Sequence, residues 1–314
     1  MAIPNIRARH RAAAALSAAL LMATLTTALT GAARQPASPA LPVQAAFSPS
    51  GPYATTTGTA TDGTAVYDLY RSASYAALGF QSPIVTWGNG TNGSPAQVSV
   101  LLRHLASYGF TVIASTLPNT GSGREVDAAA HYLVTQNGVA ASVFHGHLNV
   151  NEVAAVGTSQ GATGAVRAAT NDPALIKTVM TFSLPSAVWA APNPDCPTAA
   201  DCTAHPDALT RPAFFVSTHG FWDSIIASPA TERAYFLSAP VHAALGIITN
   251  SDGKPADHAS IADPASGGNP GGFLGYATAW LEYQLRGNLT AAGAFTGPHP
   301  ELLANPNWPG GAVK

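Results

Sequence analysis

A serine flanked by glycines is the clearest reactive element in the sequence. Residues 157–161 read Gly-Thr-Ser-Gln-Gly and fit the pattern G-x-S-x-G. A short apolar run at residues 153–156 precedes them, and an Ala-rich segment that favours a helix follows them. Glycines on both sides suit a sharp strand-to-helix turn with a strained serine and no room for side chains. We therefore expect Ser159 to be a nucleophile exposed above a sheet.

A second loop offers backbone amides to the same site. Residues 83–87 (Pro-Ile-Val-Thr-Trp) predict a buried strand, and residues 88–93 after it carry almost no side-chain bulk. Amides in such a loop can face a ligand. The amide of Gln160, next to Ser159 and at the start of the predicted helix, can meet a developing oxyanion.

Two later strands end in loops that carry the partners of a nucleophilic serine. The strand at residues 212–216 leads to Asp223, and the strand that ends near Ile248 leads to His258. In α/β-hydrolases the acid and then the histidine follow the serine in this order, at strand ends. We expect His258 to take the proton from Ser159 and Asp223 to orient and stabilise the imidazole ring.

Other residues compete for these two roles. The rivals are Asp252 and Asp257 for the acid, and His219 and His242 for the base. His242 lies within a predicted strand, which favours a packed side chain. His145 and His147 form an H-x-H pair that a solvated loop explains better than a metal site does. We expect no metal and no organic cofactor.

The rest of the chain alternates strands with helices. We predict strands at residues 53–60, 64–71, 83–87, 110–114, 153–156, 178–182, 212–216 and 241–248, and helices at 94–108, 124–135, 160–170, 231–237 and 273–285. This alternation predicts an α/β protein with a mostly parallel sheet covered by helices on both faces, in one domain at residues 51–287. The first two strands, joined at Asp62-Gly63, would form an antiparallel edge. Residues 288–314, dense in Gly and Pro from 297 onward, predict an irregular tail.

The N-terminus predicts export. Three arginines within the first eleven residues precede an Ala- and Leu-rich run to about residue 29 and then small residues, the pattern of a secretory signal peptide at 1–33. An uncleaved anchor is the alternative, but the run is only weakly apolar. Residues 34–50, rich in Pro, Ala and Ser, predict a flexible lead. We expect a secreted, extracellular monomer with no stable membrane insertion after cleavage.

The composition and the two cysteines limit which partners and which cysteine chemistry the protein can have. Only 10% of the 314 residues are charged and the net charge is −2, which argues against nucleic acid as a partner. Cys196 and Cys202 are the only cysteines. In an exported protein such a close pair predicts one local disulfide. Two cysteines without a Cys/His cluster make a poor zinc site.

These segments together resemble the secreted bacterial cutinase-like polyester hydrolases, an α/β-hydrolase group that includes poly(ethylene terephthalate) hydrolases. The resemblance covers residues 51–287. It is most specific in residues 83–88, in the helix end and strand Leu-Ala-Ser-Tyr-Gly-Phe-Thr-Val-Ile-Ala, in the elbow with Gly-Ala-Val-Arg-Ala-Ala-Thr-Asn-Asp-Pro-Ala-Leu after it, and in the two later loops. It implies a triad of Ser159, Asp223 and His258, and an oxyanion hole built from the amides of Asn89 and Gln160. The implied substrates are esters or polyesters, cleaved through an acyl-enzyme intermediate.

The chain departs from this family around the expected cleft. Asn89 stands where an aromatic residue is usual, the elbow reads Thr-Ser-Gln-Gly in place of His-Ser-Met-Gly, and Leu184, Pro185 and Ser186 replace a usual tryptophan. The usual C-terminal disulfide is also missing. Because those aromatics grip flat polymer rings, ester hydrolysis carries over better than polyester breakdown. We place Leu184 at the cleft, with Trp189 and Trp222 as replacement aromatics.

Two other functions fit the same sequence. One is a peptidase or another acyl transferase on the same fold, which triad chemistry alone does not separate from an esterase. The other is a non-catalytic exported binding protein. The presence of all three triad residue types in order argues against the binding protein.

Overall fold

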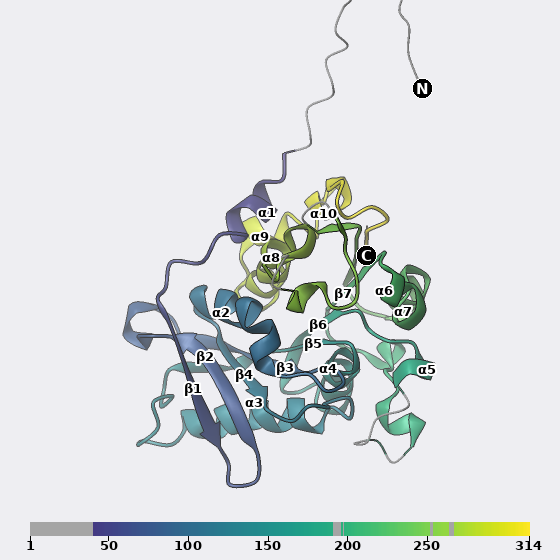
Figure 1. Ribbon diagram of the computed structural model, residues 1–314. Coiled ribbons are helices and arrows are strands. Elements are labelled where there is room, and N and C mark those ends of the chain that lie inside the picture. The colour runs from purple at the N-terminus through teal and green to yellow at the C-terminus, as the bar shows by residue number, and fades with distance from the viewer. Residues whose placement is uncertain (1–39, 191–195, 197, 252–253, 264–266) are drawn as a thin grey trace, which may run out of the picture. The chain divides into compact units, whose positions relative to one another are not determined.

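Nine strands of the described chain form one sheet, in the order β1-β2-β4-β3-β5-β6-β7-β8-β11 (Figure 1). The computed structural model describes residues 40–190, 196, 198–251, 254–263 and 267–314. The predicted signal peptide and residues 34–39 of the lead lie outside the described residues. The strands are β1 (Thr55–Thr61), β2 (Val66–Ser72), β3 (Ser82–Gly88), β4 (Thr111–Ser115), β5 (Leu148–Thr158), β6 (Ile176–Phe182), β7 (Ala213–Thr218), β8 (Ala243–Ile248) and β11 (Ala312–Val313), and a separate pair comprises β9 (Asn250–Ser251) and β10 (Lys254–Pro255).

The sheet is mostly parallel, as predicted. Strands β4, β3, β5, β6, β7 and β8 run parallel to one another, whereas β1, β2 and β11 pair antiparallel at the two edges. Each predicted strand overlaps an observed one, although β5 is longer than expected. Parallel pairing brings the carboxyl ends of β3, β5, β6, β7 and β8 to one edge of the sheet, and the loops that carry the predicted site follow those ends.

Helices cover both faces of the sheet. The described helices are α1 (Pro42–Phe47), α2 (Ser99–Ser107), α3 (Arg124–Asn137), α4 (Gln160–Asn171), α5 (Ala187–Ala190), α6 (Phe221–Ile226), α7 (Pro229–Ser238), α8 (Phe273–Arg286), α9 (Leu289–Ala292) and α10 (Glu301–Ala304). Buried side chains of α2 and α8 pack in one hydrophobic cluster, and those of α3, α4 and α7 pack in a second cluster. The predicted α/β-hydrolase fold is therefore confirmed.

The alternation along β3 explains why both faces need helices. Ile84 packs in the cluster under α3 and α4, while Val85 and Trp87 pack in the cluster under α2 and α8. Successive strand residues point to opposite faces, so β3, which is buried at every position, needs a helix layer on each face of the sheet.

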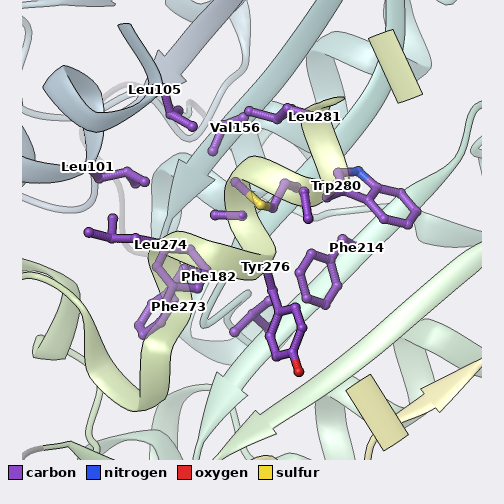
Figure 2. Close-up of a cluster of buried hydrophobic side chains, with 14 of the residues drawn as sticks. Leu101, Leu105, Val156, Phe182, Phe214, Phe273, Leu274, Tyr276, Trp280 and Leu281 are labelled. Atoms are coloured by element: carbon purple, nitrogen blue, oxygen red, sulfur yellow. The ribbon is translucent and has the colours of Figure 1, made fainter. Parts of the chain in front are cut away.

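Aromatic side chains fill the cluster between α8 and the sheet (Figure 2). Phe273 of α8 meets Phe182 of β6 edge-on, with ring centroids 5.2 Å apart, and Trp280 lies 5.5 Å from Phe214 of β7. The indole N–H of Trp280 donates to Thr178 Oγ1 at 2.9 Å, which satisfies its one polar group. This packing fixes the closing helix across the strands whose ends carry the site.

The predicted domain limits need correction at both ends. Part of the predicted flexible lead forms helix α1. The Glu301 carboxylate accepts hydrogen bonds from two backbone N–H groups of this helix, those of Val43 (2.5 Å) and Gln44 (2.7 Å). The predicted irregular tail forms α9, α10 and β11, and buries Trp308 against the sheet. A high Gly and Pro content indicates only that the backbone does not favour long helices or strands. The described part of the lead and the tail are ordered because a few of their side chains are buried against the domain. One compact unit spans Pro39–Lys314.

Within the described residues, no helix combines the length and the apolar character that a membrane-spanning segment needs.

Candidate active site

The turn between β5 and α4 has the geometry that its glycines predict. Ser159 has φ 53° and ψ −128°, a region that L-residues rarely adopt. Its N–H donates to Phe182 O on β6 at 2.9 Å, which ties the strained residue to the sheet. A side chain at Gly157 would collide with the backbone of Gly161, and one at Gly161 would collide with the backbone of Gly88. The three glycines allow α4 to start directly above the sheet.

Asp223 and His258 form a close pair. His258 Nδ1 lies 2.6 Å from Asp223 Oδ1, and the exposed fractions of the two side chains are 18% and 0%. Asp223 sits in the first turn of α6, after β7, and His258 lies in the loop that follows β8 and the β9–β10 pair. With Nδ1 directed at Asp223, Nε2 is the ring nitrogen left to accept a proton.

The other oxygen of the Asp223 carboxylate is also held. Its Oδ2 accepts Ser183 Oγ at 2.7 Å, Thr218 N at 2.9 Å and Thr218 Oγ1 at 2.6 Å, with Ser217 Oγ at 3.4 Å. Hydrogen bonds to a carboxylate offset the cost of burying it and fix its plane. The pair is therefore oriented from both carboxylate oxygens.

Ser159 and His258 line the same cavity, which has a volume of about 360 Å³. Its apolar wall comes from Trp87, Val98, Ile226, Ala259, Ile261 and Ala262. Asn89, Gly90, Thr91, Gly93, Ser94, Gln97 and Thr158 supply its polar and backbone surface. The structure thus brings the predicted nucleophile, base and acid to one end of the sheet, around a pocket of the size that small ligands occupy.

Asn89 lines the cavity, but its side chain points into the protein. Its Oδ1 accepts the indole N–H of Trp87 at 3.0 Å, and its Nδ2 donates to Ser115 O at 2.7 Å and Leu117 O at 2.9 Å. The carboxamide therefore fixes this loop rather than making the cleft mouth polar. Gln160 is the first residue of α4. The amides of Asn89 and Gln160 stay the predicted oxyanion donors.

Three predicted cleft residues do not line this cavity. Leu184 is fully buried and packs in the cluster under α3, α4 and α7, so its assignment to the cleft is wrong. Trp189 of α5 and Trp222 of α6 have exposed fractions of 43% and 55%, but neither is among the described residues that line the cavity. We assigned all three to the cleft because they follow strand ends. Whether a side chain faces the cavity also depends on its direction, which the sequence position does not give.

The rival residues have other roles in the structure. Asp257 Oδ1 accepts backbone N–H groups instead of facing the imidazole nitrogen. His242, predicted within a strand, lies directly before β8 and stacks on Trp280 with ring centroids 5.8 Å apart, so its side chain is packed as predicted. His219 is exposed, and His145 and His147 are also exposed, as expected for solvated loops. Asp252 lies outside the described residues.

A buried glutamate near Asp223 had no sequence signal. Glu232 of α7 is fully buried, and its Oε1 accepts Leu184 N at 2.6 Å, while Oε2 has no hydrogen-bond partner among the described residues. Burial, and secondarily the charge of Asp223, raise the pKa of Glu232 well above its ordinary value, although the Leu184 N–H opposes this. We expect a neutral carboxyl. Ser183, directly before Leu184, has a φ of 55°, and its hydroxyl donates to Asp223 Oδ2.

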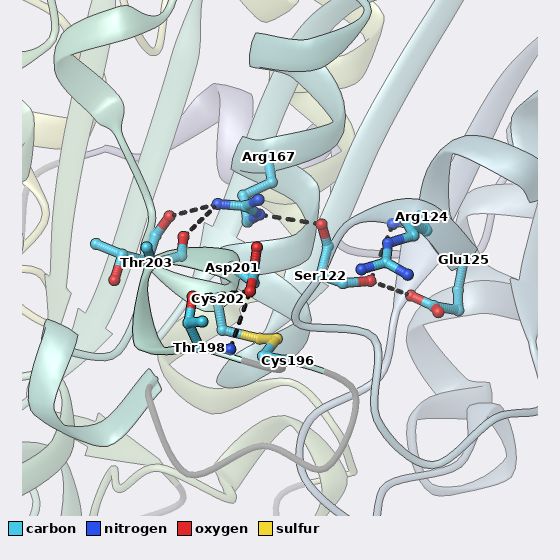
Figure 3. The surroundings of a disulfide bond; sticks show 10 residues. Ser122, Arg124, Glu125, Arg167, Cys196, Thr198, Asp201, Cys202 and Thr203 are labelled. Carbon is cyan, nitrogen blue, oxygen red and sulfur yellow. Dashed lines mark hydrogen bonds between the residues drawn. A yellow bond between two sulfur atoms is a disulfide. The ribbon is translucent and has the colours of Figure 1, made fainter.

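Cys196 and Cys202 form the predicted disulfide, with Cα atoms 5.7 Å apart (Figure 3). Arg167 of α4 connects the same loop to the elbow helix, because its Nη1 donates to Ala200 O at 3.0 Å and to Thr203 O at 3.2 Å. Its Nε donates to Ser122 O at 3.0 Å. The disulfide loop is thus attached to the helix that begins directly after Ser159.

One group of described residues has the composition of a metal site. Asp127, His131 and Asp172 offer ligand atoms that all lie within 4.8 Å of one another. They come from α3 and the end of α4, and none of them lines the cavity of Ser159. The described residues of the cavity hold one imidazole and no carboxylate, which does not match the ligand set of a metal centre.

Comparison of the chain with protein-family models and with curated proteins finds no match. The assignment of the site therefore depends on its geometry.

Proposed function

We propose that this protein is a secreted serine hydrolase that cleaves carboxylic esters through an acyl-enzyme intermediate. The supporting observation is the oriented pair of Asp223 and His258, 2.6 Å apart, beside a positive-φ Ser159 that shares a cavity with the histidine. A strained serine at a strand-to-helix turn, a base and a buried acid are the parts that nucleophilic acyl transfer needs.

The residues divide the reaction as follows. Ser159 Oγ attacks the ester carbonyl carbon while its proton passes to His258 Nε2. Asp223 stabilises the imidazolium through Nδ1. The backbone N–H groups of Asn89 and Gln160 donate hydrogen bonds to the former carbonyl oxygen and stabilise its negative charge. His258 then gives its proton to the leaving alcohol, and water enters by the reverse steps to release the acid and regenerate Ser159.

The cavity wall favours a neutral substrate. Its described lining contains apolar, amide, hydroxyl and backbone groups, and its only ionisable side chain is that of His258. A charged acyl group would lose hydration there without gaining an opposite charge. A volume of about 360 Å³ suits a small or medium-sized acyl group. We propose esters of neutral acids as substrates, with soft aliphatic polyesters as larger ones.

Ser159→Ala tests this function. We expect the variant to lose turnover of p-nitrophenyl butyrate, apart from the residual acceleration that binding and an oxyanion hole give. A serine-directed phosphonate should add its mass to the wild type and not to the variant. Ser238→Ala, which changes an exposed serine on α7, is the matched control and should keep full activity.

Two outcomes would contradict the proposal. A folded Ser159→Ala protein that keeps more than about a hundredth of the wild-type kcat would remove Ser159 from the reaction. A wild-type protein with neither turnover nor a phosphonate adduct would favour the binding protein.

A further inference from the structure

One oxygen of Asp257 connects the two loops that carry the acid and the base. Asp257 Oδ1 accepts the backbone N–H of Trp222 at 2.9 Å, of Asp223 at 3.1 Å and of His258 at 2.8 Å. Two of these donors belong to the β7–α6 segment and the third to the loop after β10. The same atom therefore fixes the main chain of Asp223 and of His258 relative to each other.

We propose that Asp257 is a positioning residue, which sets the distance between the backbones of Asp223 and His258. This inference rests on the proposed function, because it assigns a role in a reaction that those two residues perform. Asp257 acts through them and does not touch the cavity, since it is not among the described residues that line it.

The main chain of Asp257 is itself held in place. Its own N–H donates to Ser260 Oγ at 2.7 Å, and its carbonyl oxygen accepts Ser260 N at 2.8 Å. On the opposite side, a Cβ at Gly220 would overlap the Asp257 side chain, so only a glycine at that position lets the carboxylate approach. A closed local turn and a glycine-sized gap thus preset the position of Oδ1.

The donors that Asp257 accepts need a partner. The N–H groups of Trp222 and Asp223 lie in the first turn of α6, where a helix leaves its N–H groups without intrahelical acceptors. A carboxylate there satisfies both of them and forms stronger bonds than a neutral acceptor does. Removing it would free the start of α6 and the backbone of His258 together. A catalytic group displaced by about 1 Å can cost on the order of 100-fold in rate.

The test compares substitutions that keep or remove the acceptor. We expect Asp257→Ala to lower kcat on p-nitrophenyl butyrate on the order of 100-fold with a smaller change in KM, because the part of the cavity wall formed by residues 87–98 comes from other segments. Asp257→Asn still presents an oxygen to the three N–H groups, so we expect it to recover most of that loss. Asp207→Ala, which removes an exposed carboxylate outside the site, is the control and should match the wild type.

Gly220→Ala gives an independent measurement. Its methyl group would displace the Asp257 side chain without changing any acid, so we expect a fall in kcat in the same direction. The rate of phosphonate addition to Ser159 should fall in parallel, because that reaction also needs His258 in position. If Asp257→Ala does not fold, Asp257→Ser serves instead, since its shorter side chain cannot reach all three donors.

Three results would overturn the inference. A folded Asp257→Ala protein with the wild-type kcat and phosphonate rate would show that the clamp is not needed. Equal losses in Asp257→Asn and Asp257→Ala would assign the effect to charge rather than to hydrogen-bond acceptance. A fall in melting temperature without a fall in kcat would make the residue structural only. All three are distinct from failure of the proposed function, which an active Ser159→Ala protein would show.

Discussion

Two of the aspartate–histidine pairs in the described chain lie in very different surroundings. In the pair of Asp223 and His258 the nitrogen and oxygen lie 2.6 Å apart, and the side chains are 0% and 18% exposed. In the pair of Asp172 and His131 the distance is 3.1 Å, and the exposed fractions are 27% and 53%. The first pair follows strand ends beside Ser159, while the second joins α3 to the end of α4 on the surface.

The difference means that an aspartate–histidine pair is not sufficient support for the proposed catalytic role. Solvent competes for exposed charges, so the surface pair contributes little energy. Oδ2 of Asp223 receives three short hydrogen bonds from Ser183 and Thr218, whereas Oδ1 of Asp172 accepts the N–H of Leu175 at 3.1 Å. Burial of the pair and its denser hydrogen bonding, together with a strained serine in the same cavity as His258, distinguish the candidate site.

The largest expected effect separates the two pairs directly. We expect Asp223→Asn to lower kcat on p-nitrophenyl butyrate by about 10³–10⁴-fold, because an amide favours the wrong imidazole tautomer, and His258→Ala to have a comparable effect. Asp172→Asn and His131→Ala make the same changes in the surface pair and should leave kcat unchanged. Steady-state kinetics on the four folded variants tests this. If the surface variants lose activity and the buried ones keep it, the roles are reversed.

A smaller expected effect concerns Glu232, which is buried near Asp223. The pKa of folded Glu232 is raised, so the folded protein keeps a proton that an unfolded glutamate loses above its ordinary value of 4.5. The free energy of unfolding then decreases as pH rises from 4.5 toward the raised pKa. Glutamine does not ionise, so the melting temperature of Glu232→Gln, relative to the wild type, should increase over that range.

The control for this prediction comes from the surface cluster. Partial burial also raises the pKa of Asp127, but its side chain is 33% exposed, so Asp127→Asn should show a weaker trend. Melting curves from pH 4.5 upward would measure both variants. A difference for Glu232→Gln that does not change with pH would mean that the folded protein ionises this carboxyl in the ordinary range.

The smallest expected effect concerns the exposed aromatics outside the cavity. Trp222→Ala and Trp189→Ala should leave hydrolysis of p-nitrophenyl butyrate unchanged, because neither side chain lines the cavity. An aromatic contact contributes about 0.5–1.5 kcal/mol beyond its burial, so we expect a loss of about two- to tenfold on polymer substrates. We also expect polycaprolactone to be cleaved faster than poly(ethylene terephthalate) film. Equal rates on both polymers that neither substitution alters would contradict this.

Much of the fold can be predicted from the sequence, because the patterns that indicate strands, helices and turns are local in the chain. Apolar runs and helix faces located the strands and helices, and the glycines around Ser159 predicted its conformation before the structure showed the positive φ. Chain order and strand-end position placed Asp223 and His258 in separate loops, which the parallel sheet brings together. Each of these inferences needed only a pattern and the rule that parallel strands end at one edge.

The remaining features depend on contacts that no local pattern encodes. Glu232 looks like an ordinary surface residue of a helix, and only the packing of α7 buries it. Asn89 was placed correctly in its loop, but the direction of its carboxamide depends on carbonyl groups of residues 115 and 117. Asp257 was a rival acid in the sequence, and three backbone donors assign it another role.

The bond from Glu301 to the start of α1 has a consequence for how the chain reaches this structure. Its donor at Val43 lies 258 positions away in the sequence, so this contact closes a very long loop. Contacts of such separation require more chain entropy to be lost before they form, which delays them. Until α1 docks, the side chains of α8 that contact Val43 and Phe47 face solvent. If α1 docks last, the chain carries this apolar surface until then, and the surface can capture a second chain.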